Sequence, residues 1–119
     1  MKFTLFCILI SLTILSGCSK PTAEELFTAA QTSYQEVQKA QSQEKAFRDS
    51  VGVAAIDLYM KVVKEYPETE LGERAMFMVA TIRQNEMQDF ANAVGAYKQY
   101  IEIYPNGSQA PIAMFQVGS

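Results

Sequence analysis

The sequence has no histidine and no tryptophan, and its two cysteines, Cys7 and Cys18, both lie near the N-terminus. Histidine and reactive cysteine supply the commonest acid–base and nucleophilic groups of enzymes, so the composition favours a protein that is not an enzyme. A zinc site with several thiolate or imidazole ligands is excluded for the same reason, and we expect no metal and no cofactor. The formal net charge is −3 and no basic run is present, so nucleic acid is not an expected partner.

The longest apolar run lies at the N-terminus. Lys2 precedes the thirteen residues Phe3–Leu15, in which Ser and Thr are the only polar members. This length is shorter than the roughly 20 residues that cross a bilayer as a helix, and it is typical of a secretory signal. The run ends in Leu15-Ser16-Gly17-Cys18, which resembles the lipobox of bacterial lipoproteins. The alternative is an ordinary secretory signal with an incidental cysteine.

This resemblance implies that residues 1–17 are a signal peptide, that Cys18 is the lipidated residue, and that residues 18–22 link the lipid anchor to a domain. Removal of Lys2 would leave nine basic residues (10 − 1) against thirteen acidic ones, a net charge of −4. Ser19 follows the cysteine, whereas in enteric-type sorting an Asp there retains a lipoprotein in the inner membrane. The resemblance therefore implies an outer-membrane location on the periplasmic side, or another envelope membrane if the source is Gram-positive.

Residues 55–80 repeat as residues 93–118 with a constant offset (93 − 55 = 38) and no gap. A repeat of about this length is typical of stacked helical hairpins. The spacing of apolar residues independently predicts helices, as does the capping pattern of Thr22 with Glu25. The predicted helical faces are Leu26, Ala30, Tyr34 and Val37 within 22–45, then Leu71, Ala75, Met78, Val79 and Ile82, and finally Phe90, Ala93, Val94, Tyr97, Ile101 and Tyr104.

The turns between these helices are predicted from polar and helix-breaking residues. They are Glu68-Thr69-Glu70, Gln84–Asp89 and Gly107-Ser108-Gln109, and no segment alternates as a strand would. The region 41–52 leaves two alternatives open, either a turn within it or two long helices. The predicted fold class is thus all-α, a solenoid of helical hairpins with about five helices over residues 23–119.

The repeated pattern resembles the tetratricopeptide repeat, especially the form found in bacterial envelope lipoproteins. Its second helix reads Ala93-x-x-x-Tyr97-x-x-x-Ile101-x-x-Tyr104-Pro105, with a matching copy from Ala55 to Pro67. By pattern, the chain is similar to the tetratricopeptide lipoprotein of the β-barrel assembly machinery and to the periplasmic coordinator associated with the Tol–Pal system. The resemblance implies small Ala where helices cross, and Tyr residues that pack in the core with hydroxyls able to reach water or a backbone group.

The resemblance also implies a function and a site. The implied function is a lipid-anchored scaffold or adaptor that binds an envelope protein; the alternative is a periplasmic binding module for a peptide, glycan or small ligand. In this family ligands lie on the concave face formed by the first helix of each hairpin. The positions carried over to that face are Arg74, Phe77, Thr81, Gln84, Ile112 and Phe115. For the two Phe, the competing interpretation is that they pack against each other across adjacent hairpins.

The last segment, Gln109–Ser119, carries Ile112, Met114, Phe115 and Val117 and no charge. In the repeat register it is the first helix of a hairpin without its second helix. A solenoid normally ends in a helix with a polar outer face. We therefore expect either that the chain is truncated at its C-terminus or that this helix mediates self-association.

Overall fold

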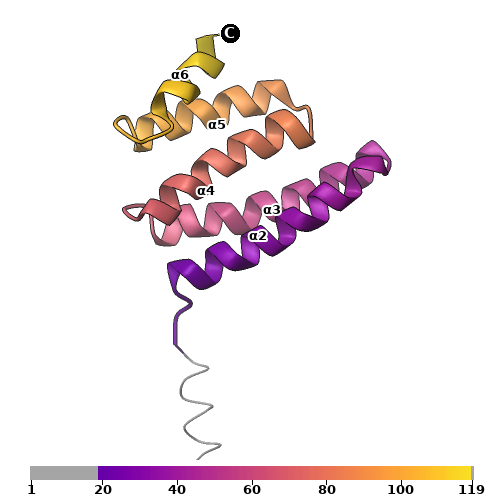
Figure 1. Ribbon diagram of the computed structural model, residues 1–119, viewed down its shortest axis with the longest axis horizontal. Helices are drawn as coiled ribbons and strands as arrows, with labels where there is room; N and C mark the ends of the chain where they lie inside the picture. The colour runs from indigo at the N-terminus through magenta and orange to yellow at the C-terminus, as the bar shows by residue number, and fades with distance from the viewer. Residues whose placement is uncertain (1–18, 119) are drawn as a thin grey trace, which may run out of the picture.

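The computed structural model describes residues 19–118, which form an all-α array of five α-helices with no strand (Figure 1). This confirms the predicted fold class. The signal peptide and Cys18 lie outside the described residues, as does Ser119. The helices are α2 (Ala23–Lys39), α3 (Lys45–Glu65), α4 (Glu70–Thr81), α5 (Phe90–Ile103) and α6 (Ala110–Gly118), with a 3₁₀ turn at Ala40–Ser42 and a π-turn at Ile82–Glu86.

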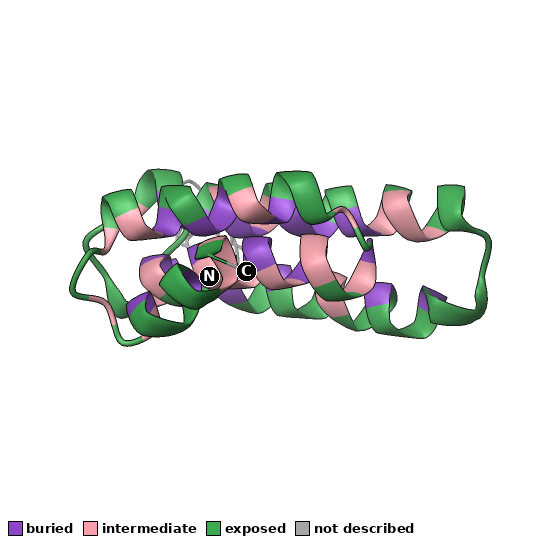
Figure 2. Ribbon diagram, turned by 90° about the horizontal axis from the view of Figure 1, so that it is seen from above, coloured by how far each residue is buried: buried purple, intermediate pink, exposed green. Residues whose placement is uncertain are grey.

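The helices stack in chain order as antiparallel hairpins. Each helix packs on its neighbours in the sequence, and α2 also touches α4. Figure 2 shows that the buried positions gather where the helices face one another, while the outer surfaces are exposed. Within the described part of the chain, no helix is both long enough and apolar enough to cross a membrane.

Side chains of the turns start the helices where the sequence predicts. The Oγ1 atom of Thr22 accepts a hydrogen bond from the Glu25 amide at 3.2 Å. In the same way, Thr69 accepts from Gly72 at 3.0 Å and Asp89 accepts from Asn92 at 3.3 Å. These caps satisfy amides that have no partner in the first turn of a helix.

Two boundaries differ from the predicted ones. The first helix ends at Lys39 rather than Lys45, and a turn at Gln43 and Glu44 is followed by the long α3; a turn within 41–52 is therefore the correct alternative. The polar segment Gln84–Asp89 is not a simple turn, because the backbone remains helical to Glu86 as a π-turn.

The core follows the repeat. Ala55 and Ala93 are buried where helices cross, and Tyr59 and Tyr97 are 1% and 2% exposed, as predicted. Phe90 was predicted on the buried face of its helix and is instead 61% exposed, whereas Tyr100 is completely buried. Phe90 is the first residue of α5 and lines an open cavity with the buried Ala93 and Tyr97 and with Gln116 of α6, so it lies on the predicted face but is not covered there.

A tyrosine closes each hairpin on itself. The hydroxyl of Tyr104, just after α5, donates a hydrogen bond to the Pro67 carbonyl ahead of α4 at 2.7 Å. The hydroxyl of Tyr66, just after α3, donates to the Pro21 carbonyl ahead of α2. The hydroxyls of Tyr66 and Tyr104 thus reach a backbone group, as predicted, whereas that of Tyr97 donates to the side chain of Gln84.

The residues ahead of α2 are held to the domain by a second set of contacts. Lys20 forms an ion pair with Glu65 at 2.9 Å, and its ammonium lies 5.2 Å from the centre of the Tyr66 ring. The hydrogen bond and charge of Glu65 raise the pKa of Lys20, and those of Lys20 lower the pKa of Glu65. The segment from Lys20 to Thr22, which we call the tether, is thus docked on the end of α3.

Candidate functional site

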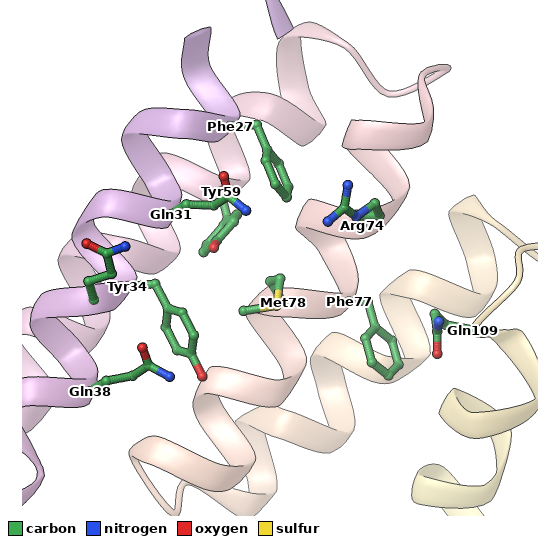
Figure 3. Close-up of a pocket in the computed structure, with 10 residues that line it drawn as sticks. Phe27, Gln31, Tyr34, Gln38, Tyr59, Arg74, Phe77, Met78 and Gln109 are labelled. Atoms are coloured by element: carbon green, nitrogen blue, oxygen red, sulfur yellow. The ribbon is translucent and has the colours of Figure 1, made fainter. Parts of the chain in front are cut away.

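A groove with a cavity of about 470 Å³ runs across the inner helices α2, α4 and the start of α6 (Figure 3). It is lined mainly by aromatic and amide side chains. The lining residues are Phe27, Gln31, Tyr34, Gln35, Gln38, Tyr59, Arg74, Phe77, Met78 and Gln109. A mixed apolar and amide lining suits a polypeptide, which presents both kinds of group.

One wall of the groove is a row of polar side chains on α2. Gln31, Gln35 and Gln38 are spaced by four and three residues, so they share one helical face. The adjacent face of α2 carries the buried Ala30 and Val37, which pack into the core. Within the described residues, the side-chain amides of Gln31 and Gln35 have no hydrogen-bond partner and remain available to a ligand.

Tyr34 occupies the far end of the same wall. Its hydroxyl donates a hydrogen bond to Glu86 Oε1 at 2.8 Å, which ties α2 to the π-turn after α4. Burial raises the pKa of Tyr34 to about 12, and the Glu86 carboxylate contributes because it accepts a hydrogen bond from the neutral phenol and its charge disfavours the phenolate. Gln38 is also hydrogen-bonded to Tyr34, so this end of the groove is already internally paired.

Arg74 lies at the opposite end, on α4. Its guanidinium stacks over the ring of Phe27, with its central carbon 4.9 Å from the ring centre. Phe27 in turn meets the edge of Tyr59 at 5.6 Å between ring centres, and both rings are buried. Four ion pairs occur among the described residues and none of them includes Arg74. The positive charge of Arg74 is therefore held in place by an aromatic ring and has no carboxylate partner in the described chain.

The six site residues implied by the family resemblance do not form one site. Arg74 and Phe77 line the groove together. The hydroxyl of Thr81 donates to the Met78 carbonyl of its own helix at 3.0 Å. Ile112 and Phe115 lie on α6, 48% and 71% exposed, and neither is among the residues that line the groove.

Gln84 has a structural role. Its Oε1 accepts the Tyr97 hydroxyl at 2.6 Å, and its Nε2 donates to Gln116 at 2.9 Å. It therefore joins the end of α4 to α5 and α6, and it lines a separate cavity with Phe90. This side-chain amide is already paired with the protein itself.

The expected packing of Phe77 on Phe115 is wrong. Phe77 meets Tyr97 and Tyr100 edge-on, with ring centres 5.8 and 5.7 Å apart, within its own hairpin. Phe115 remains 71% exposed on α6. The helix that covers Phe77 is α5, and the described residues contain no equivalent helix after α6.

A carboxylate fixes the start of α6 against the preceding hairpin. Glu73 Oε1 accepts hydrogen bonds from the Tyr100 hydroxyl at 2.6 Å and from the Ser108 amide at 2.8 Å. The Tyr100 hydroxyl also accepts from the Gln109 amide at 3.1 Å. Burial, with the hydrogen bond to Glu73, raises the pKa of Tyr100 to about 12. This network places Gln109 at the mouth of the groove.

The α2 wall of the groove was not predicted from the sequence. Phe27 and the amide row lie outside the part of the chain that repeats, so the repeat alignment carried no site residue there. The signal that was present is the i, i+4, i+7 spacing of Gln31, Gln35 and Gln38 on a helix whose other face is apolar.

Among residues 19–118, no group of three or more His, Cys, Asp or Glu side chains is placed to hold a metal ion. Residues 74–107 match the family model of the tetratricopeptide repeat, a span that covers most of α4 and all of α5. No curated protein and no solved structure matched the chain. The chain thus contains a tetratricopeptide-type repeat in an all-helical array. Such repeats generally bind protein partners, and their fold is typically non-catalytic.

Proposed function

We propose that this protein is a lipid-anchored scaffold or adaptor of the bacterial cell envelope that binds another protein in the groove between α2, α4 and α6. The anchor is the lipid on Cys18, and the location is the periplasmic side of the outer membrane. The envelope part of this proposal is supported by Lys2, the apolar run Phe3–Leu15 and the lipobox-like Leu15–Cys18.

The groove is the observation that supports a binding role. It is open, it crosses the inner helices, and two of its amide side chains, Gln31 and Gln35, have no partner in the described structure. Gln31 and Gln35 offer hydrogen-bonding groups that can replace water around the main chain of a partner, and the concavity that presents them is formed before binding.

The lining argues against a sugar as the ligand. A sugar-binding site stacks a ring of the ligand on an exposed aromatic face. Of the four lining aromatics, Phe27 and Tyr59 are 5% and 1% exposed, and Tyr34 and Phe77 are partly buried by their contacts with Glu86 and with Tyr97 and Tyr100. The faces of Phe27 and Tyr59 are covered by the core and by Arg74. A protein segment needs no such platform, because main-chain amides can pair with the Gln side chains.

The test is a pair of bulky substitutions at exposed glutamines. Gln35→Trp fills the groove, whereas Gln99→Trp adds the same side chain on α5, outside the groove. Each variant is cross-linked in cells, purified from solubilised membranes, and analysed by mass spectrometry for attached proteins.

We expect a protein that is attached to the wild type and to Gln99→Trp and lost from Gln35→Trp. Equal recovery of the same partners by all three forms would show that binding does not use the groove. Circular dichroism of both variants checks that the helical fold is retained.

A further inference from the structure

We propose that the groove recognises an extended protein segment through an Asp or Glu side chain of that segment, which pairs with Arg74. The main chain beside that acidic residue is held by Gln31 and Gln35. This inference rests on the proposed protein-binding function and adds the chemistry of the partner.

The charge distribution of the groove is the first argument. Arg74 is the single charged residue among the described residues that line it, although the whole chain carries thirteen acidic and ten basic residues. Glu70, one helical turn before Arg74, is not in ion-pair contact with it. The lining of the groove is therefore complementary to a single negative charge, and the two carboxylates beside it, Glu86 and Glu73, are hydrogen-bonded to Tyr34 and Tyr100.

The geometry of Arg74 is the second argument. The guanidinium of Arg74 lies over the Phe27 ring, with its central carbon 4.9 Å from the ring centre. It forms no ion pair within the described residues, so its N–H groups are available to a ligand. A planar fork of N–H groups matches the two oxygens of a carboxylate. The ring also reduces the conformational freedom that Arg74 has to lose when it binds.

The α2 wall supplies the third argument. Gln31 and Gln35 are separated by four helical residues, a rise of about 6 Å. Two residues of an extended chain span about 6.8 Å. A side-chain amide offers both a donor and an acceptor. Gln31 and Gln35 can therefore each pair with one peptide group of an extended segment, at positions two residues apart. Neither amide has a hydrogen-bond partner within the described structure, so no internal bond is broken on binding.

The position of Arg74 points to a side chain of the ligand rather than to its C-terminus. Arg74 projects from α4, the middle of the three helices, with Phe27 and Gln31 of α2 on one side and Gln109, just before α6, on the other (Figure 3). A segment held by Gln35 and Gln31 on α2 that continues towards Gln109 passes Arg74 on the way, so it has chain on both sides of Arg74. The carboxylate that meets Arg74 there belongs to an internal residue.

The experiment uses the full protein purified from membranes in mild detergent. A random library of twelve-residue peptides, acetylated and amidated so that no terminal charge remains, is selected on the immobilised protein. Individual binders are then synthesised with each Asp changed to Asn and each Glu to Gln, and their affinities are measured by fluorescence anisotropy. A second library with free C-terminal carboxylates is selected in parallel.

We expect blocked binders that share one acidic residue, and a loss of affinity of about tenfold when that residue is neutralised, as for a charge-assisted bidentate pair. Arg74→Gln should weaken the acidic peptide by the same factor and should leave the neutralised peptide unchanged. Lys98→Gln, which removes one positive charge from an exposed position on α5 outside the groove, should change neither.

The outcomes separate the two proposals. Binders that tolerate neutralisation, or that bind only with a free C-terminal carboxylate, would overturn the acidic-side-chain inference and leave the proposed binding function standing. A selection that yields no binder from either library would contradict the proposed function as well. Equal losses in Arg74→Gln and Lys98→Gln would show a general charge effect and would also overturn the inference.

Discussion

Gly95 and Gly72 both lie in helices, yet their replacement by alanine should have opposite effects on the free energy of unfolding. Gly95 is exposed in the interior of α5, and a Cβ built on it has no neighbour within 4 Å. Alanine is favoured over glycine inside a helix by about 0.5–1 kcal/mol. Gly95→Ala should therefore raise the free energy of unfolding by about 0.5–1 kcal/mol. This corresponds to a rise in the melting temperature of about 4 °C.

Gly72 stands in the first turn of α4, against the turn that ends the previous hairpin. A Cβ there would overlap the Tyr66 carbonyl oxygen and would lie 3.1 Å from the Tyr104 hydroxyl and 3.2 Å from Pro67 Cα. The nearest of these atoms, the Tyr66 carbonyl oxygen, belongs to the backbone, so it cannot move away as the end of a flexible side chain can. Forced packing of this kind typically destabilises a protein by about 1–3 kcal/mol. This loss is larger than the stability that alanine gains over glycine from its higher helix propensity. We expect Gly72→Ala to lower stability by about 1–2 kcal/mol net.

Urea unfolding followed by far-UV circular dichroism measures both changes, with the slope of the unfolding curve checking that the transition stays comparable. The repeat sharpens the comparison, because the position equivalent to Gly72 is Ala110 (72 + 38 = 110). From the repeat alone, alanine would be expected to fit at both places. A neutral or stabilising Gly72→Ala would refute the close approach of α4 to Tyr66, and a destabilising Gly95→Ala would refute the open surroundings of Gly95.

Three further predictions follow from other parts of the chain. Cys18→Ala should leave the protein as unprocessed precursor or as a soluble form, and a variant of mature size that still fractionates with membranes would contradict the lipobox. Tyr97→Ala should destabilise the fold by about 3 kcal/mol through a cavity, and Ala93→Leu by about 2 kcal/mol through overpacking, both measured by urea unfolding; near-neutral effects would contradict the repeat packing. The pKa of Tyr34 and of Tyr100 is raised from 10.0 to about 12, so the unfolded chain ionises first. Stability should hold below pH 10 and fall between about pH 10 and 12, and tyrosinate absorbance that appears near pH 10 in the folded protein and is reduced by Tyr34→Phe or Tyr100→Phe would refute this.

Most of the fold could be predicted because its signals are local or repeated. Thr22 with Glu25 marks the start of α2 through a cap whose geometry depends on adjacent residues only. The Tyr-Pro pairs that follow α3 and α5 end those helices because proline cannot continue them and restricts the residue before it. The 38-residue offset then predicts which alanines and tyrosines are buried, since equivalent positions meet equivalent neighbours.

The groove was harder to predict because it depends on which side of each helix a neighbour covers. Phe90 shares a face of α5 with the buried Tyr97 but stands at the first residue of the helix, and periodicity alone does not say how far along a helix its neighbours cover that face. Gln84 shows the same limit. Its place on the inner face suggested a ligand contact, but Tyr97 and Gln116 satisfy its amide. A polar residue on a concave face is available to a ligand only if no other residue of the protein is hydrogen-bonded to it. Whether such a partner is present depends on the tertiary packing.

The position of the tether indicates how the groove would be oriented relative to the membrane. Lys20 is docked on Glu65 and Tyr66, at the edge where α2 begins and where the α3–α4 and α5–α6 turns also lie (Figure 1). Arg74 belongs to the second turn of α4 and stacks on Phe27 near the start of α2, so the cationic end of the groove is at this same edge. Cys18 precedes Lys20 by two residues, about 8 Å of extended chain at most. A lipid on Cys18 would therefore hold this edge close to the bilayer, and a partner segment that pairs with Arg74 would meet the groove at its membrane-facing end.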